Sequence, residues 1–590
     1  MSKSPDLAVQ TSEPGGSIEE LLSRRAQIAR MLAREQERHE RADSFLVRTE
    51  IARHIRSLNQ RLAAIDSDLN EQARSGSERR PQRLTTLRLL VTVLLIMGCL
   101  AIAILPFWIV SFPPLLDYPN HLARVFILAH LHDPAFHFSE YYAADWGPYP
   151  YLTMDAFMVG LQRFCNVLTA GKILLSLSIL SVPLASWFFV HQAKHENTLL
   201  ASLSLITTWN LFFLWGFINM QLSMALVLMV AGLWLRYLRR PTWPRWLSFL
   251  AAALALYFTH LLGFGIAGLV VAGYCIFTRR PRRQFILASI PFAFGALMHL
   301  ATRIAIAGSV SRQPNDPWEI IWRPFSEKAE ELGTLMQGYS ARIDKLTLIV
   351  LALACFAAWW RNREFHWNRP WALVIAGLFC LYWIFPAGYG VGADADLRLL
   401  PFMLLFVPVA ASFGKRTRWL FAVLLLLFVL RSGVIIRTFS ARQPELAHMA
   451  SSFSIAPPNA RVLPLVEAKA EEEQEPPQQR PYAHFWAYGT IERGWFAPYL
   501  FAERGVQVLQ IKVDTATPDG FWDLEYKDEP EWQDIAEDYD YVWAYNTAKY
   551  APQLQRIGDQ VFNDGNLAMY RIRKPAEEEE TRDDDSRGSP

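Results

Sequence analysis

"LRLLVTVLLIMGCLAIAILPFWIVS", residues 87–111, is the first long apolar stretch of the chain. One helix needs about 20 apolar residues to cross the hydrocarbon core of a bilayer. Stretches of similar length and character recur from this one to about residue 436. The sequence therefore predicts a polytopic membrane protein that is mainly α-helical.

The apolar stretches predict about eleven transmembrane helices. Trp and Tyr, of which the chain has 21 and 20, gather near the ends of these stretches, as residues at a membrane interface do. We expect a transmembrane domain over residues 86–438, with a long first outer loop at 112–168. The predicted spans are residues 87–111, 169–190, 198–215, 219–237, 246–260, 261–278, 284–306, 343–360, 370–387, 398–413 and 418–437.

The distribution of charge gives the expected orientation. Lys and Arg number 58 against 56 Asp and Glu, so the net charge indicates no nucleic-acid partner. Every second loop is basic, and basic loops stay in the cytoplasm. The N-terminus is therefore expected in the cytoplasm, and an odd number of spans places the C-terminus on the outer side. The basic loops carry Lys194, Arg236, Arg239, Arg240, Arg245, Arg279, Arg280, Arg282, Arg283, Arg361, Arg363, Arg369, Lys415, Arg416 and Arg418.

Residues 1–85 are expected to form a charged, helical cytoplasmic tail. Ile51, Ile55, Leu58, Leu62, Ile65 and Leu69 repeat at spacings of four and three, which is a heptad pattern. An earlier apolar series, at residues 18–32, is out of phase with it. A helical hairpin and a short self-associating coiled coil both fit, and so does an amphipathic helix docked on the membrane domain.

The C-terminal part is expected to be a small α/β domain on the outer face, over residues 439–575. "ARVLPLV" (460–466) and "YDYVWAYN" (539–546) have the composition of buried strands. "DQVFNDGNLAMYRIR" (559–573) predicts a hairpin with a turn at residues 563–565. The acidic end, 576–590, predicts a disordered tail. The five cysteines lie in or beside apolar stretches, so no disulfide framework or cysteine metal site is expected.

A second stretch, "LLDYPNHLARVFILAHLHD" (115–133), places Asp117, His121 and Arg124 directly after the first span. Other ionisable side chains are expected at the same membrane surface from separate spans. They are His260, Arg303, Asp394, Asp396 and Arg398. Ionisable groups at membrane depth are costly and usually functional. Their convergence on one leaflet predicts a polar cavity open to the outer side.

Most of these residues also have a structural explanation when they are taken alone. Asp117 has the position of a helix cap. Arg303 and Arg398 lie at span ends, where Arg extends to lipid phosphate. Asp394 and Asp396 lie in a Gly-rich turn, where Asp is common. The combination of these residues, more than any one of them, favours a functional site.

"DYPNHLAR", "LWGFINMQLSMAL", "YFTHLLGFG" and "DADLRLLPF" resemble stretches of a family of uncharacterised bacterial integral membrane proteins. The predicted topology is similar to that of C-type membrane glycosyltransferases, which use polyprenyl-phosphate-linked sugars. The resemblance covers about residues 87–440 and, loosely, the C-terminal domain. It implies a protein of the bacterial inner membrane that transfers a sugar at its outer face in envelope glycan or exopolysaccharide assembly.

The resemblance also suggests roles for the polar residues. An inverting transfer needs a carboxylate to accept the proton of the acceptor hydroxyl, and cations to stabilise the departing phosphate. Asp117 is the expected base. The expected substrate-binding residues are His121, Arg124, His260, Arg303, Asp394, Asp396 and Arg398. A divalent cation on Asp117 with Asp394 or Asp396 is an open alternative, and the sequence leaves the metal unknown.

Two other functions stay open from the sequence. One is a transporter or flippase for a lipid-linked glycan, which would need polar residues through the whole depth of the membrane. The other is a non-catalytic component of a polysaccharide or envelope assembly, because a fold can persist after its chemistry is lost. In that case the N-terminal tail and the outer domain would be docking modules.

Overall fold

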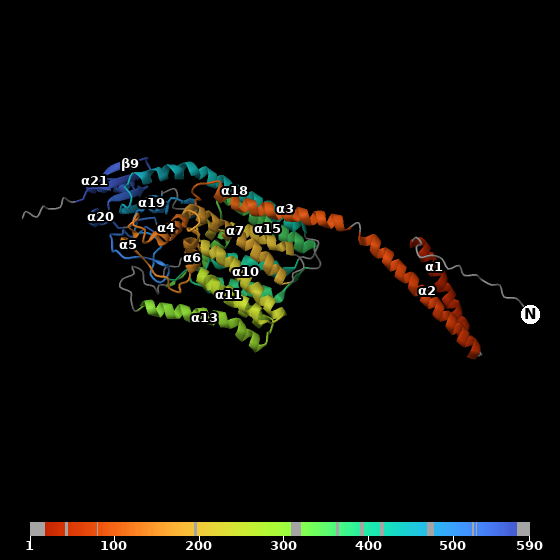
Figure 1. The fold of residues 1–590 in the computed structure, drawn as a ribbon. Helices are drawn as coiled ribbons and strands as arrows, with labels where there is room; N and C mark the ends of the chain where they lie inside the picture. Colours follow the sequence, from red (N-terminus) through yellow and green to blue (C-terminus); the bar gives the residue numbers. More distant parts are fainter. Residues whose placement is uncertain are drawn as a thin grey trace, which may run out of the picture. The chain divides into compact units, whose positions relative to one another are not determined.

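The computed structural model describes residues 18–41, 45–78, 81–193, 198–307, 320–361, 365–389, 394–412, 418–468, 477–521, 524–526 and 528–574 (Figure 1). The chain divides into two compact units, Met1–Gly98 and Cys99–Pro590. The predicted disordered tail at 576–590 lies outside the described residues, as do Lys194, Arg363, Lys415 and Arg416 of the predicted basic loops.

The first unit contains a helical hairpin, as one of the sequence alternatives predicted. Helix α1 (Ile18–Glu40) packs against α2 (Phe45–Glu78). Leu21 of α1 and Leu58 of the heptad series are buried, and Arg25 pairs with Asp66 at 2.6 Å. Only part of the heptad series is buried in this way, and self-association between chains stays a prediction.

In the described ranges, the membrane part contains six helices that are long and apolar enough to cross a bilayer. They lie within α3 (Pro81–Trp108), α7 (Val167–Gln192), α10 (Ile218–Arg239), α13 (Arg282–Ala307), α15 (Ala341–Arg361) and α18 (Arg418–Ser451). This is a multi-pass membrane protein. Shorter helices α11 (Trp243–Thr259), α12 (Leu261–Phe277), α16 (Arg369–Ile384) and α17 (Leu399–Ala410) match four further predicted spans. The count of eleven spans stays a prediction.

The predicted span at 198–215 is not one continuous helix. It consists of η1 (Thr198–Ser202), α8 (Leu203–Thr208) and α9 (Leu211–Leu214). The break falls at Asn210, whose side chain accepts a hydrogen bond from the Phe213 amide and so starts a new helix. An Asn that binds local backbone competes with helix continuation.

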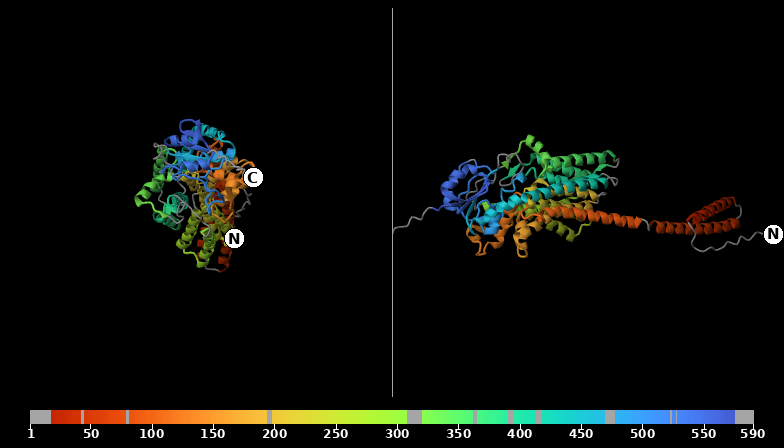
Figure 2. Two further views of the ribbon diagram at one scale, coloured as in Figure 1. Left: turned by 90° about the vertical axis from the view of Figure 1, so that its left-hand side faces the viewer. Right: turned by 90° about the horizontal axis from the view of Figure 1, so that it is seen from above.

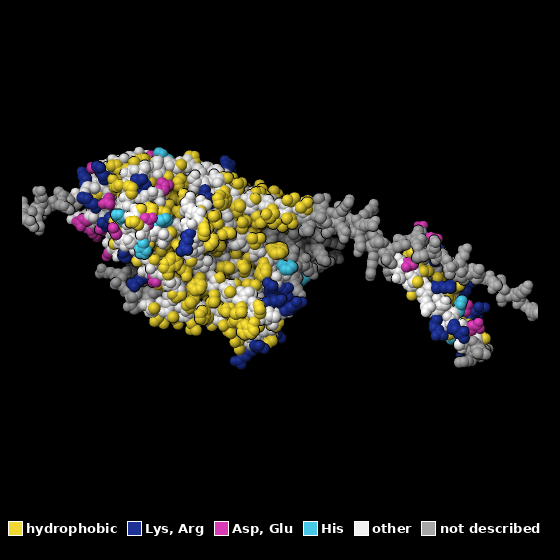
Figure 3. All heavy atoms as spheres, viewed as in Figure 1, with side chains coloured by type: hydrophobic (Ala, Val, Ile, Leu, Met, Phe, Trp, Pro, Cys, Tyr) yellow, Lys and Arg dark blue, Asp and Glu magenta, His cyan; other side chains and the backbone are white. Residues whose placement is uncertain are grey.

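Helix α10 is the centre of the bundle and packs against α7, α11 and α12. The surface around these helices is apolar: large hydrophobic side chains such as Trp187, Leu269 and Leu297 are exposed. Figure 3 shows this apolar surface between charged residues at two ends. We call the end with the C-terminal domain the domain end, and the opposite end, with the arginine-rich turn 236–245, the basic end.

The C-terminal domain contains the predicted strands. Its four-stranded sheet has the order β6 (Val462–Val466), β8 (Tyr541–Tyr545), β10 (Leu567–Ile572), β9 (Gly558–Asn563). β6 and β8 are parallel, and β9 and β10 form the predicted hairpin, with Gly565 at φ +95° in its turn. Helices α19 (Ala487–Arg493), α20 (Trp532–Asp538) and α21 (Ala551–Ile557) complete the domain. Helix α18, predicted to end near residue 437, continues to Ser451 and leads directly to this domain (Figure 2).

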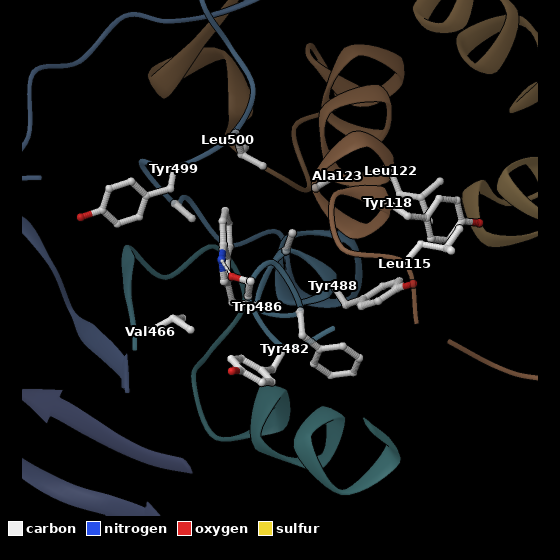
Figure 4. Packing of buried hydrophobic residues seen from close by; sticks show 14 of the residues in the cluster. Leu115, Tyr118, Leu122, Ala123, Val466, Tyr482, Trp486, Tyr488, Tyr499 and Leu500 are labelled. Atoms are coloured by element: carbon white, nitrogen blue, oxygen red, sulfur yellow. Dashed lines mark hydrogen bonds between the residues drawn. The ribbon is translucent and has the colours of Figure 1, made fainter. Parts of the chain in front are cut away.

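The first loop folds together with the C-terminal domain. It contains α4 (Tyr118–His130), α5 (Phe138–Tyr141), β1 (Tyr142–Ala144) and α6 (Leu152–Leu161). β1 pairs antiparallel with β7 (Leu509–Ile511) of the C-terminal domain, and α4 packs against α19. In Figure 4, Tyr118 and Leu122 of α4 lie beside Tyr488 of α19. One hydrophobic core therefore joins segments more than 300 residues apart in sequence.

Candidate functional site

Asp117 lies at the N-terminus of α4, at the domain end of the membrane part. Its own amide donates to the Trp215 carbonyl at 2.9 Å. Its backbone is helical (φ −87°, ψ −9°), and its carboxylate makes no capping hydrogen bond to α4. The capping explanation for Asp117 therefore does not apply, and the carboxylate is directed to other groups.

Gly216 fixes the position of Asp117 from the opposite side. It has φ +93°, and a Cβ atom there would lie 2.9 Å from the backbone nitrogens of Asp117 and Tyr118. A positive φ and such a close approach both require glycine. The turn "LWGFINM" thus packs its backbone directly on the first residues of α4.

The next residue, Phe217, contacts Arg398. The guanidinium carbon of Arg398 lies 4.5 Å from the centre of the Phe217 ring, within the range of a cation–π interaction. Adjacent residues of one turn therefore contact Asp117 and Arg398, and Asp117 acts electrostatically on the Arg398 guanidinium. The structure thus brings together the two residues predicted as base and phosphate ligand.

Arg398 lies at the polar end of a cavity of about 930 Å³ in the domain half of the bundle. Helices α12 and α13 form much of its wall through Leu261, Phe264, Leu269, Phe292 and Ala296, among others. Lining positions run from Leu261 to Ala272 on α12, which corresponds to roughly 16 Å of helix. Leu269 is also exposed on the apolar surface, so the cavity reaches the side that faces lipid.

Polar side chains gather at one end of this cavity. Tyr151, His260, His299 and Arg398 line it there, whereas Ser289, farther along α13, donates its hydroxyl to the Phe285 carbonyl. Among the described residues, neither Arg398 Nε nor His299 Nδ1 has a hydrogen-bond partner, although both atoms are buried. Buried polar groups are usually paired, so these two atoms distinguish this end of the cavity from its apolar remainder.

His260 connects the end of α11 to the start of α12. Its Nδ1 accepts a hydrogen bond from the Gly263 amide at 3.3 Å, so the proton of the neutral ring is on Nε2. The His260 ring meets Tyr151 edge to face, with ring centres 5.2 Å apart. Tyr151 itself has φ +76°, which is uncommon for a residue with a side chain and typical of functional sites.

His121 lies one turn along α4 from Asp117. Its ring packs on Phe501 of the C-terminal domain, with ring centres 4.9 Å apart. Burial, together with nearby Arg124 and His484, holds the pKa of His121 well below its usual value, so the ring is neutral at pH 7. Its buried Nδ1 has no partner in the described part of the chain.

Arg124 is paired inside the protein. Its Nε and Nη2 atoms donate to Asp155 Oδ1 of α6 at 3.2 and 2.7 Å, and both side chains are 1% exposed. Burial raises the pKa of Asp155, and Arg124 opposes that effect. The structure thus assigns the Arg124 guanidinium a carboxylate partner of its own, between α4 and α6.

Asp394 and Asp396 also have cationic partners. Arg323 binds Asp394 at 2.6 Å and Asp396 at 2.8 Å, and Lys328 lies 3.3 Å from Asp396. Arg398 follows two residues later, at the start of α17. The two aspartates therefore hold the turn that presents Arg398.

The remaining predicted residue, Arg303, is outside the cavity lining. It lies one turn beyond His299 on α13 and acts on His299 electrostatically. In the described ranges, no group of three or more His, Cys, Asp or Glu side chains could hold a metal ion. The carboxylates suggested as partners of Asp117 for a cation, Asp394 and Asp396, instead bind Arg323 and Lys328.

The C-terminal domain contributes two residues that sequence reasoning missed. His484 lies 3.4 Å from Asp117, measured from Nε2 to Oδ1. Glu503 lies near Arg124 and Tyr151, and burial raises its pKa to about 7, with Arg124 opposing the shift. His484 is the single histidine after residue 448, which is a weak signal. Nothing in the sequence around Glu503 distinguishes it from the other acidic residues of the domain.

The chain matches no protein-family model and no curated protein. Among solved structures it is similar to ArnT from Cupriavidus metallidurans in the apo state, at 11% sequence identity and a TM-score of 0.45. The similarity covers 81% of this chain and 98% of the ArnT chain.

Proposed function

We propose that this protein transfers a sugar from a polyprenyl-phosphate donor to an acceptor hydroxyl at the domain end of the membrane part. The observation that carries the proposal is the position of Arg398 at the polar end of an apolar cavity of about 930 Å³. Such a cavity fits a ligand with an apolar body and an anionic head. The similarity of the predicted topology to that of C-type membrane glycosyltransferases supplies the donor class.

Arg398 and His260 are the proposed ligands of the donor phosphate. The planar guanidinium of Arg can give a phosphate two parallel hydrogen bonds, and Arg398 Nε has no partner among the described residues. His260 Nε2–H is a further donor at the same end of the cavity. Held by these groups, the phosphate would place the anomeric carbon toward Asp117.

Asp117 is the proposed general base. Its carboxylate accepts the proton of the acceptor hydroxyl while the hydroxyl oxygen bonds to the anomeric carbon. The bond from that carbon to the phosphate oxygen breaks, and polyprenyl phosphate leaves with the electron pair. Arg398 stabilises the charge that develops on the phosphate. Attack from the face opposite the leaving group inverts the anomeric centre.

The proposed location is the outer face of a bacterial inner membrane, in envelope glycan or exopolysaccharide assembly. The arginine-rich turn between α10 and α11 lies at the basic end, away from the C-terminal domain (Figure 3). By the positive-inside rule that end faces the cytoplasm. We accordingly propose residues 1–85 as a cytoplasmic tail, 86–438 as the transmembrane domain and 439–575 as a periplasmic domain.

Lipid-phosphate binding is tested with the full chain in nanodiscs and farnesyl phosphate as the probe, by native mass spectrometry. Arg398→Ala should weaken binding by about 10- to 100-fold, the value of a charge-assisted hydrogen bond. Arg303→Ala is the matched control, since Arg303 is outside the cavity lining, and it should bind within about twofold of wild type. Equal affinity of wild type and Arg398→Ala would refute the site.

Transfer is tested with a panel of farnesyl-phosphate-linked hexoses and a bacterial lipid extract as the source of acceptors. Release of farnesyl phosphate, measured by mass spectrometry, should be lost in Asp117→Asn while probe binding is kept. Binding without release by wild type would instead indicate the non-catalytic component. Passage of the probe from one leaflet to the other would indicate the transporter, although the apolar lining beyond the polar end argues against a continuous polar path.

A further inference from the structure

We propose that His484, a residue of the C-terminal domain, is a positioning residue for Asp117. In this role the neutral imidazole directs its Nε2–H at Asp117 Oδ1 and holds the carboxylate for proton transfer. The inference rests on the proposed role of Asp117 as the base. It makes the C-terminal domain a part of the reaction site, in addition to its place in the fold.

The tautomer of His484 follows from Asn120. Asn120 Oδ1 accepts from the Phe501 amide at 2.8 Å, and its Nδ2 donates to the Tyr499 carbonyl at 2.8 Å. These two hydrogen bonds identify the oxygen and the nitrogen of the Asn120 side-chain amide. The same Nδ2 lies 3.3 Å from His484 Nδ1, so Nδ1 must be the acceptor. The proton of the neutral ring is therefore on Nε2, the atom that faces Asp117.

The surroundings hold the imidazole in place. His484 is 6% exposed, and its ring contacts the rings of Phe501 and Phe521, with ring centres 5.4 and 5.7 Å away. Asn120 is fully buried and also ties the segment 499–501 to α4. Figure 4 shows that segment, at Tyr499 and Leu500, running beside α4. A buried ring that is packed against neighbouring aromatic rings can direct a proton more accurately than a surface side chain can.

The distance between Nε2 and Oδ1 is 3.4 Å, longer than a strong hydrogen bond. Catalytic hydrogen bonds are often long in a site without its substrate and shorten when the substrate binds. A donor on Oδ1 leaves Oδ2 as the oxygen for the acceptor proton. Partners that orient metal ligands change activity by about 10- to 100-fold, and we expect a residue that orients a reacting carboxylate to act on the same scale.

The activity test uses two amide variants of His484 in the full chain in nanodiscs, with the farnesyl-phosphate-linked hexoses as donors. Gln places its amide where Nε2 of His lies, whereas the shorter Asn reaches only to the level of Nδ1. We expect His484→Asn to lower kcat about 10- to 100-fold with KM for the donor within about twofold. His484→Gln should restore most of kcat. Equal losses in both variants, at equal thermal stability, would overturn the positioning role.

A second measurement does not depend on turnover. In a spectrum of the ¹⁵N-histidine-labelled chain, the His484 signals are those lost in His484→Gln. Nε2 should be protonated and Nδ1 unprotonated, and Asp117→Asn should shift the Nε2 signal. A proton on Nδ1, or on both nitrogens, would overturn the inference even if the enzyme is active.

The two tests also separate failure of this inference from failure of the proposed function. If the tautomer is as stated but the wild-type chain releases no farnesyl phosphate, the proposed transferase is wrong and the His484–Asp117 contact is structural. If the wild type is active and His484→Asn matches it, the transferase stands and the positioning role is wrong.

Discussion

The guanidinium of Arg398 lies 4.5 Å from the ring centre of Phe217, and the residue before Phe217 packs on Asp117. Two residues of one turn thereby set the separation between an arginine at the start of α17 and a carboxylate at the start of α4. The site is thus assembled by backbone packing at Gly216 as much as by charge. Substitutions should therefore disturb the site most at positions where this packing leaves no space for a larger side chain.

Gly216→Ala should destabilise the domain end. The variant combines an unfavourable φ with a Cβ atom 2.9 Å from the nitrogens of Asp117 and Tyr118, and we expect a cost of about 1–3 kcal/mol. Gly160→Ala is the control, because a Cβ there meets nothing within 4 Å. Thermal unfolding in detergent compares the two. A wild-type unfolding temperature for Gly216→Ala would contradict the described packing.

The effects of substituting Arg124 and Asp155, which form a buried ion pair, on the free energy of unfolding should be strongly coupled. Either single change, Arg124→Met or Asp155→Leu, leaves a buried charge without its partner, which costs about 3–5 kcal/mol. The double variant removes both charges and should be more stable than each single variant. Thermal unfolding of all four proteins measures the coupling, and additive losses would show that the pair does not form.

Glu503 should make stability depend on pH. Its pKa is raised from 4.5 to about 7, so the folded state binds the proton more tightly than the unfolded state does. The resulting stability is fully present below pH 4.5 and is lost as the pH rises through 7. At pH 8, Glu503→Gln should exceed wild type in stability by on the order of 2–3 kcal/mol. The difference in unfolding temperature should disappear near pH 4.5.

Substitution of Asp396 should destabilise the protein more than substitution of Asp394, although both carboxylates bind Arg323. Asp396 is fully buried with two cationic partners, whereas the Asp394 side chain is 21% exposed with one. Asp396→Asn should cost about 3–5 kcal/mol, and Asp394→Asn about 1 kcal/mol. Because Asp396 supports the turn that carries Arg398, Asp396→Asn should also weaken binding of farnesyl phosphate. For each variant, the unfolding temperature measures the loss of stability, and native mass spectrometry measures the affinity for farnesyl phosphate.

Gly265→Phe should block the cavity without disturbing the fold. Gly265 lines the cavity, and a Cβ there meets nothing within 4 Å, so the ring has room to extend into it. Affinity for undecaprenyl phosphate should fall at least tenfold while the unfolding temperature stays near that of wild type. Gly160→Phe, on α6, is the control. Unchanged affinity in Gly265→Phe would place the lipid chain elsewhere.

Several features followed from the sequence because they depend on local patterns. Long apolar stretches marked the membrane helices, apolar composition marked β6 and β8, and turn residues marked the β9–β10 hairpin. The heptad series at 51–69 fitted an N-terminal helical hairpin as one of three alternatives. The sequence also marked Asp117 and Arg398 among eight candidate site residues, since ionisable residues near membrane spans are rare enough to be noticed, and their roles stay predictions. Each of these inferences needs only a short window of the chain.

Tertiary structure decided which polar residues share a site. Arg124, Asp394 and Asp396 were candidates on equal terms with Arg398, but the fold gives the first three ion-pair partners and leaves Arg398 at a cavity. His484 lies more than 360 residues from Asn120 and beside Asp117 only because β1, α4 and the C-terminal domain pack as one body. The sequence does not show whether a carboxylate or guanidinium is paired or free, because its partner is determined by long-range packing that no local pattern encodes.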